Sequence, residues 1–130
     1  MKTKVTGYWA TTIPLALESL VGGEWDLTHR PYAVQMVTHL GYPAYFLTIL
    51  GFWKLLAGIA LLAPGFARLK EWAYAGVFFA MTGAAASHAA RGDNSGLIVP
   101  LSFAALTVAS WALRPQSRIL GALFPAKAKA

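Results

Sequence analysis

Residues 44–63 read AYFLTILGFWKLLAGIALLA, and this stretch decides the fold class. It holds one charged residue, Lys54, and is followed at once by Pro64 and Gly65, a strong helix stop. About 20 mostly apolar residues are what an α-helix needs to cross the roughly 30 Å hydrocarbon core of a bilayer. The stretch therefore predicts a membrane-spanning helix.

Three further windows give the same signal with different strength. Residues 72–90 and 97–113 hold no formally charged side chain, whereas residues 5–23 are interrupted by Pro14 and Glu18. We predict a span in each of them, which makes four spans in total.

The first window has a competing interpretation as a cleaved signal peptide, because Lys2 and Lys4 precede an apolar stretch of suitable length. Glu18 interrupts that stretch, and no small-x-small cleavage site precedes the charged segment 24–26. Both features favour a retained span.

The composition supports an integral membrane protein. Of 130 residues 57% are hydrophobic, with 11 Lys or Arg and 5 Asp or Glu, about half the charged share of a soluble domain. The absence of cysteine excludes disulfides, thiol redox chemistry and thiolate metal sites. With no internal repeat or linker, residues 1–130 are predicted to form one all-α domain, a four-transmembrane-helix bundle.

The basic residues predict the topology, because Lys and Arg gather in short cytoplasmic flanks. With both termini cytoplasmic, only Arg30 and Arg91 lie outside, and Lys54 lies within a span. The cytoplasmic residues are then Lys2, Lys4, Arg68, Lys70, Arg114, Arg118, Lys127 and Lys129. We expect a multi-pass protein of a bacterial-type plasma (inner) membrane, whose basic residues contact anionic lipid headgroups rather than nucleic acid.

The longest segment between spans, residues 24–42, is predicted to be external. Pro31 begins a stretch with an apolar side that ends before Gly41, as is typical of a short helix. We expect this helix to lie in the membrane interface between the first and second spans.

Small residues mark the faces by which helices pack in lipid. Such stripes are Gly51, Lys54 and Gly58 in the second span, Gly76, Ala80, Ala84 and His88 in the third, and Thr11, Pro14, Glu18 and Gly22 in the first. Lys54, His88 and Glu18 are thus predicted to point into the bundle. Because an unpaired charge at the bilayer centre costs at least about 2.5 kcal/mol, we predict an ion pair between Glu18 and Lys54.

Structural interpretations stand beside functional ones for these groups. The ion pair either only fixes helix register or serves a ligand or a proton. His88, near the end of a span, is first an interfacial hydrogen-bonding residue, with Ser87 as its expected partner. The external His29, His39, Glu24, Asp26 and Asp93 have no recognised ligand spacing, so no metal site is predicted.

Four blocks of sequence carry a family resemblance. They are HLGYPAYF (39–46), G-x-W-K-x-x-x-G-x-A-L-L-x-P (51–64), RLKEWAYAG (68–76) and GAAASHAARGD (83–93). The chain resembles the DoxX-like family of small four-span membrane proteins, some of which are associated with quinone-linked oxidation of reduced sulfur or with oxidative-stress assemblies. The matched polar and aromatic positions are Lys54, Glu71, Trp72, Tyr74, Ser87, His88 and Asp93.

The resemblance and the inward charges together predict a membrane subunit that binds a quinone-like or other lipophilic small molecule for a partner oxidoreductase. The site is expected between the helices, open toward the external leaflet, with Glu18, Trp53, Lys54, Tyr74, Ser87 and His88 as ligand-binding residues. No flavin, haem or iron–sulfur motif is present, so no covalently bound cofactor is expected and quinone is the one cofactor considered.

Two other classes of function stay open. An interaction or assembly protein without a ligand would use the small-residue stripes and the external helix to dock another membrane protein or a second copy. An intramembrane enzyme would use Glu18 or His88 as acid or base, although no nucleophile motif supports it.

Overall fold

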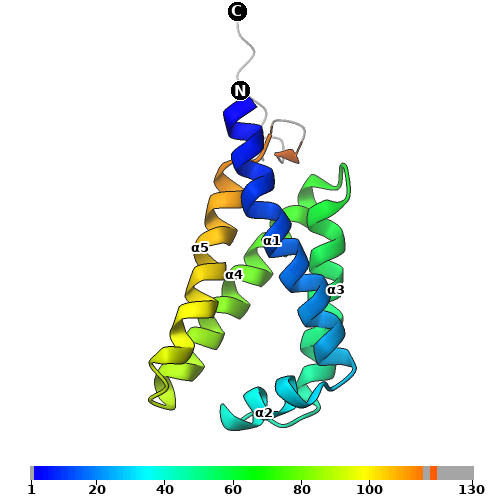
Figure 1. Ribbon diagram of the computed structural model, residues 1–130. Helices are drawn as coiled ribbons and strands as arrows, with labels where there is room; N and C mark the ends of the chain where they lie inside the picture. The colour runs from blue at the N-terminus through cyan, green and yellow to red at the C-terminus, as the bar shows by residue number, and fades with distance from the viewer. Residues whose placement is uncertain (1, 116–117, 120–130) are drawn as a thin grey trace, which may run out of the picture.

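The computed structural model describes residues 2–115 and 118–119, and its regular structure is helical throughout that part of the chain. The helices are α1 (Lys2–Leu27), α2 (Pro31–His39), α3 (Phe46–Leu62), α4 (Ala67–Ala90), the 3-10 turn η1 (Ser95–Leu97) and α5 (Ile98–Ala112) (Figure 1). A helix occupies each of the four predicted windows, and the short helix beginning at Pro31 is confirmed.

The length and apolar composition of the helices support fewer spans than the four predicted. Among the described residues, one helical stretch, Ser95–Ala112, is both long and apolar enough to cross a membrane, while the apolar α3 falls short of the length required. The four-span arrangement therefore stays a prediction.

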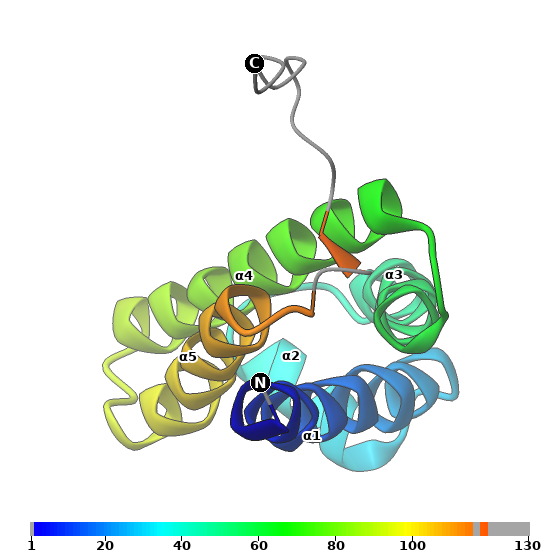
Figure 2. The same ribbon diagram turned by 90° about the horizontal axis from the view of Figure 1, so that it is seen from above.

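The four long helices form a ring when viewed along the bundle (Figure 2). In it α1 packs on α3 and α5, and α4 packs on the same two helices. At one end the α1–α3 pair and the α4–α5 pair separate, and α2 lies across that end (Figure 1). There α2 buries Ala33 and Val37 against Leu47 of α3.

Glycines allow α1 and α3 to approach each other closely. A Cβ atom on Gly51 would lie 2.7 Å from the carbonyl oxygen of Gly23 and 2.8 Å from the amide nitrogen of Leu27. On the same face of α3, a Cβ atom on Gly58 would meet the side chain of Leu20 at 2.7 Å. The predicted inward face of α3 is confirmed.

The predicted inward faces of α1 and α4 are partly wrong. In α4 the buried side chains include Tyr74, Val77 and Met81, whereas Gly76 is exposed and a Cβ atom there would meet nothing within 4 Å. Large side chains fill the core on this side, so α4 does not need small residues for close packing. The inward position of His88 is confirmed.

In α1 the small-residue rule holds on a neighbouring stripe. Thr12, Ala16, Ser19 and Gly23 are buried, with Leu15 beside them, whereas Pro14 of the predicted stripe is exposed. The first span carries two overlapping stripes of small residues, and the hydroxyl groups of Thr12 and Ser19 lie on the one that faces the core.

The interpretation of all eight basic residues as lipid-facing anchors is also wrong in part. Lys70 is fully buried, and its ammonium group donates to the carbonyl oxygens of Ala60, Ala63 and Gly65. The last turn of a helix leaves carbonyl groups without partners, and here the lysine satisfies them. Arg114 is likewise buried and forms an ion pair with Glu71.

Candidate functional site

Three charged side chains meet between α1 and α3, and we call them the ion cluster: Glu18, Asp26 and Lys54. The Nζ atom of Lys54 lies 2.9 Å from Oε1 of Glu18 and 3.3 Å from Oδ2 of Asp26. The exposed fractions of these side chains are 20% for Lys54, 19% for Glu18 and 9% for Asp26. The predicted pair of Glu18 and Lys54 is confirmed.

Asp26 was missed as a member of the cluster because the first span was expected to end at residue 23. The structure continues α1 to Leu27. Glu18, Gly22 and Asp26 then follow one another at four-residue steps, which keeps them on adjoining parts of one helix surface. A prediction that extended the first helix to residue 27 would have placed Asp26 near Lys54.

Gly22 makes room for the ion pair. A Cβ atom at this position would lie 2.8 Å from Oε1 of Glu18 and 3.1 Å from Nζ of Lys54. The close packing of Gly23 on Gly51 brings the two helices near enough for the side chains to meet. Glycines of the α1–α3 interface thus position the cluster.

Three polar atoms in or beside the cluster lack hydrogen-bond partners among the residues that the structure describes. They are Oε2 of Glu18, Oγ of Ser19 and Oδ2 of Asp26, all buried. A buried polar group without a partner costs free energy, so such groups commonly mark a place for water or a ligand.

A groove of about 690 Å³ runs between α3 and α4, and the ion cluster reaches its inner wall through Glu18 and Lys54. Ser19 lines it as well, and the aromatic side chains of its lining are Trp53, Phe66 and Trp72. Its other lining residues are aliphatic or glycine. Its volume falls within the range of about 300 to 1,000 Å³ that is typical of small-molecule sites.

The groove follows most of the length of α3. Its lining on α3 begins at Leu50 and continues past Ala63 to Phe66, toward the α3–α4 turn. The expected opening toward the external leaflet stays a prediction.

Of the six predicted ligand-binding residues, Glu18, Trp53 and Lys54 line the groove, while Tyr74, Ser87 and His88 do not. Tyr74 is buried in the core, where its hydroxyl lies 2.8 Å from Oγ of Ser110. That serine lies 2.5 Å from Oγ1 of Thr12, so the three hydroxyl groups connect α4, α5 and α1.

Ser87 and His88 have separate partners, and the predicted bond between them is wrong. The hydroxyl of Ser87 lies 2.7 Å from that of Tyr42, before α3, because the two neighbours point to different sides of α4. Nδ1 of His88 lies 2.9 Å from Oδ2 of Asp93.

Asp93 forms the centre of a second polar group at the α4–η1 turn. Its Oδ1 accepts hydrogen bonds from Oγ of Ser95 at 2.9 Å and from the amide of Gly96 at 3.1 Å. The hydrogen bond to His88, and then those to Ser95 and Gly96, hold the pKa of Asp93 below its ordinary value. This turn carries its own hydrogen-bonded polar group, separate from the groove.

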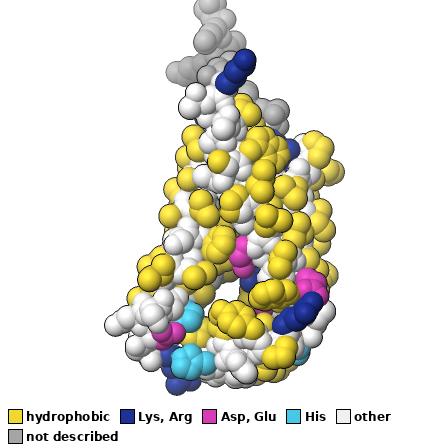
Figure 3. Space-filling model, in the orientation of Figure 1, with side chains coloured by type: hydrophobic (Ala, Val, Ile, Leu, Met, Phe, Trp, Pro, Cys, Tyr) yellow, Lys and Arg dark blue, Asp and Glu magenta, His cyan; other side chains and the backbone are white. Residues whose placement is uncertain are grey.

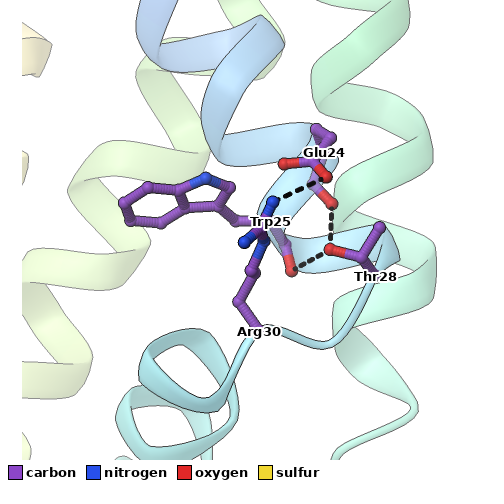
Figure 4. Close-up of polar contacts among 4 residues, drawn as sticks. All are labelled: Glu24, Trp25, Thr28 and Arg30. Carbon is purple, nitrogen blue, oxygen red and sulfur yellow. Dashed lines mark hydrogen bonds and ion pairs between the residues drawn. The ribbon is translucent and has the colours of Figure 1, made fainter.

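The remaining predicted external residues close the α1–α2 connection. Arg30 lies 3.3 Å from Glu24, and the hydroxyl of Thr28 donates to the carbonyl oxygen of Glu24 (Figure 4). His29 contacts Thr48 with its Nε2 atom at 2.9 Å. Within the described part of the chain, no three His, Cys, Asp or Glu side chains gather as a metal site would require.

The sequence matches a known protein family. A sequence profile of the DoxX-like family matches residues 10–110, most of the chain. The protein belongs to the DoxX-like family. No match was found among curated protein sequences or among solved structures.

Membership of the DoxX-like family and the apolar helices indicate a membrane protein. The matched range contains the ion cluster and the whole lining of the groove. Of the other positions that carried the resemblance, Trp72 lines the groove, and Glu71 accepts a hydrogen bond from Trp111 of α5 at 2.9 Å.

Proposed function

We propose that this DoxX-like protein is a four-span subunit of a bacterial-type inner membrane that binds a quinone-like lipophilic molecule in the α3–α4 groove and serves a partner oxidoreductase. The spans are α1, α3, α4 and α5, with both termini on the cytoplasmic side.

The surface supports this placement in a bilayer. Large apolar side chains are exposed along the helices, such as Trp72 at 70%, Phe79 at 69% and Ile98 at 68%. In Figure 3 apolar side chains cover most of the visible bundle, while acidic and histidine side chains gather toward the α2 end. A helix bundle with such a surface is stable where lipid, not water, surrounds it.

The groove is the observation that carries the proposal. Its walls are apolar and aromatic, and one buried ion cluster supplies polar atoms at its inner side. An apolar cavity with few, well-placed polar groups is the usual form of a site for a lipophilic ligand with a polar ring. The groove lies open at the side of the bundle, so its ligand enters from the lipid phase.

Titration with decylubiquinone in nanodiscs tests the proposal, because Trp53 and Trp72 line the groove and a bound quinone would quench their fluorescence. Gly76 lines the groove and has free space around its Cβ position, so Gly76→Phe should fill the groove and weaken binding by about tenfold or more. Gly83→Phe is the matched control: it lies on the same helix with equal free space, outside the groove.

The expected result is saturable quenching in the wild type and in Gly83→Phe, and its loss in Gly76→Phe. Quinone retained through purification, measured by mass spectrometry, should follow the same order. Quenching that never saturates, or that is equal in both variants, contradicts the proposal.

A second candidate is an assembly protein without a small ligand. The observation that favours it is the exposure of aromatic side chains at the edge of the groove, 67% for Phe66 and 61% for Trp53, which also suits a partner helix. In that case a partner protein should co-purify in mild detergent with the wild type and be lost in Gly76→Phe, while decylubiquinone fails to bind either form.

A further inference from the structure

The charges of the ion cluster restrict the ligand class, an inference that rests on the proposed function. Two carboxylates, Glu18 and Asp26, surround one ammonium group, that of Lys54. Among the described residues, neither carboxylate has an ion pair with a second cation. With all three groups ionised, the ion cluster behind the inner wall of the groove carries one net negative charge.

The hydrogen-bonding groups of this wall also favour an uncharged ligand. An ammonium group has three N–H donors; Lys54 donates one to Glu18 and lies 3.3 Å from Oδ2 of Asp26. Its side chain is still 20% exposed and lines the groove, which leaves a donor for a ligand. The wall therefore offers an N–H group to an acceptor oxygen, while its net charge repels an anion.

The depth of the cluster adds a third restriction. Lys54 lies in the middle of α3, which runs from Phe46 to Leu62, about 12 Å from either end. A phospholipid keeps its charged headgroup at the membrane surface, so its phosphate would not lie beside Lys54. A molecule that reaches the cluster must carry its polar group into the hydrocarbon region.

We infer that the groove selects neutral carbonyl compounds dissolved in the bilayer and excludes amphiphiles with a carboxylate or phosphate group. The carbonyl oxygen accepts a hydrogen bond from Lys54, and the apolar remainder lies along α3 and α4 toward the turn. Asp26 does not line the groove. Its negative charge beside Lys54 makes the ion cluster net negative and so sets the selectivity.

A matched pair of probes tests the inference in nanodiscs. Methyl 9,10-dibromostearate and 9,10-dibromostearate differ only in the ester, and bromine quenches the fluorescence of Trp53 and Trp72 in the groove. At about pH 9 the free acid is ionised. The ester should bind about tenfold more tightly than the acid, because like charges in an apolar site repel strongly.

Asp26→Asn removes one negative charge, and it should narrow this preference to about threefold or less while leaving ester binding in place. Glu24→Gln is the matched control: it removes a carboxylate of the same helix that pairs with Arg30, outside the cluster, and it should keep the full preference. Retained ester binding shows that each variant is folded.

The outcomes separate the two proposals. If the acid binds as tightly as the ester to the wild type, or if Asp26→Asn leaves the preference unchanged, the charge selectivity is wrong and the groove still binds lipophilic molecules. If decylubiquinone binds and the ester does not, the charge selectivity is likewise wrong and the proposed function still stands. If neither bromo probe nor decylubiquinone binds in a saturable manner, the proposed function fails as well.

Discussion

At the residue scale, Lys54 is the position on which the interior depends most. Its ammonium group lies between two largely buried carboxylates, and each partner comes from a different turn of α1. The sequence was sufficient to predict its pairing with Glu18, because a buried charge requires a partner. The role of Asp26 depended on where α1 ends, which the interrupted apolar pattern did not indicate.

Lys54→Met should destabilise the protein by about 3 kcal/mol or more, since it leaves both carboxylates unpaired in a buried site. Adding Glu18→Gln should recover part of the loss, and adding Asp26→Asn as well should recover most of it. Unfolding in detergent, followed by circular dichroism, measures these differences.

Arg30→Met serves as the comparison, because its ion pair with Glu24 is about half exposed and should contribute under about 1 kcal/mol. If the effects of the Lys54, Glu18 and Asp26 substitutions simply add, the three groups do not interact.

Asp93 gives a prediction for acid pH. Its pKa is lowered in the folded state, so its contribution to stability is present above the ordinary value of 3.8 and is lost as the pH falls below it. The wild type should therefore unfold at a higher temperature than Asp93→Asn near neutral pH, and the difference should shrink below about pH 4. A difference that is independent of pH would show that the hydrogen bonds of Asp93 do not favour its ionised form.

At the scale of single helices, sequence patterns were a good guide to position and a weaker guide to orientation. Apolar windows located all four long helices, since the lack of charge over many residues is a strong signal. The inward-packing faces of the helices were harder to predict, because α1 and α4 each carry small residues on more than one side. In α3, Gly51 and Gly58 flank Lys54, whose charge must point inward. The inward face of this helix could therefore be predicted.

The α1–α3 contact predicts a contrast between two glycines. Gly51→Ala places a methyl group against backbone atoms of Gly23 and Leu27, which cannot rotate away, and should destabilise the protein by about 1 to 3 kcal/mol. Gly76→Ala places the same group in open space within a helix and should be neutral or stabilising by up to about 1 kcal/mol. Thermal unfolding in detergent checks both, and equal effects would mean that α1 and α3 do not pack this closely.

At the scale of the whole molecule, the groove could not be predicted from the sequence. It lies between α3 and α4, and the spacing of these helices depends on how all four long helices pack. Lys54 and Glu18 were expected to lie together, but local patterns gave no indication that Trp72 shares a wall with them. His88 contacts Asp93 at the α4–η1 turn and does not line the groove.

The absence of cysteine makes the predicted topology directly testable. Single cysteines at the exposed positions Lys4, Arg68, Gln35 and Asn94 can be labelled with a membrane-impermeant maleimide. In intact spheroplasts only the cysteines at 35 and 94 should react, whereas those at 4 and 68 should react after permeabilisation. Labelling of 4 or 68 in intact spheroplasts would contradict cytoplasmic placement of the terminus and of the α3–α4 turn.

The enclosed ammonium group of Lys70 affects the surrounding lipid. Because it already satisfies carbonyl oxygens at the end of α3, this corner of the protein can lie beneath the headgroups without hydration. With 17 residues α3 is about 25 Å long, less than the roughly 30 Å of hydrocarbon around it. In the proposed four-span arrangement the leaflet must then dip or thin beside this corner, and such local deformation shortens the path of a ligand out of the acyl chains.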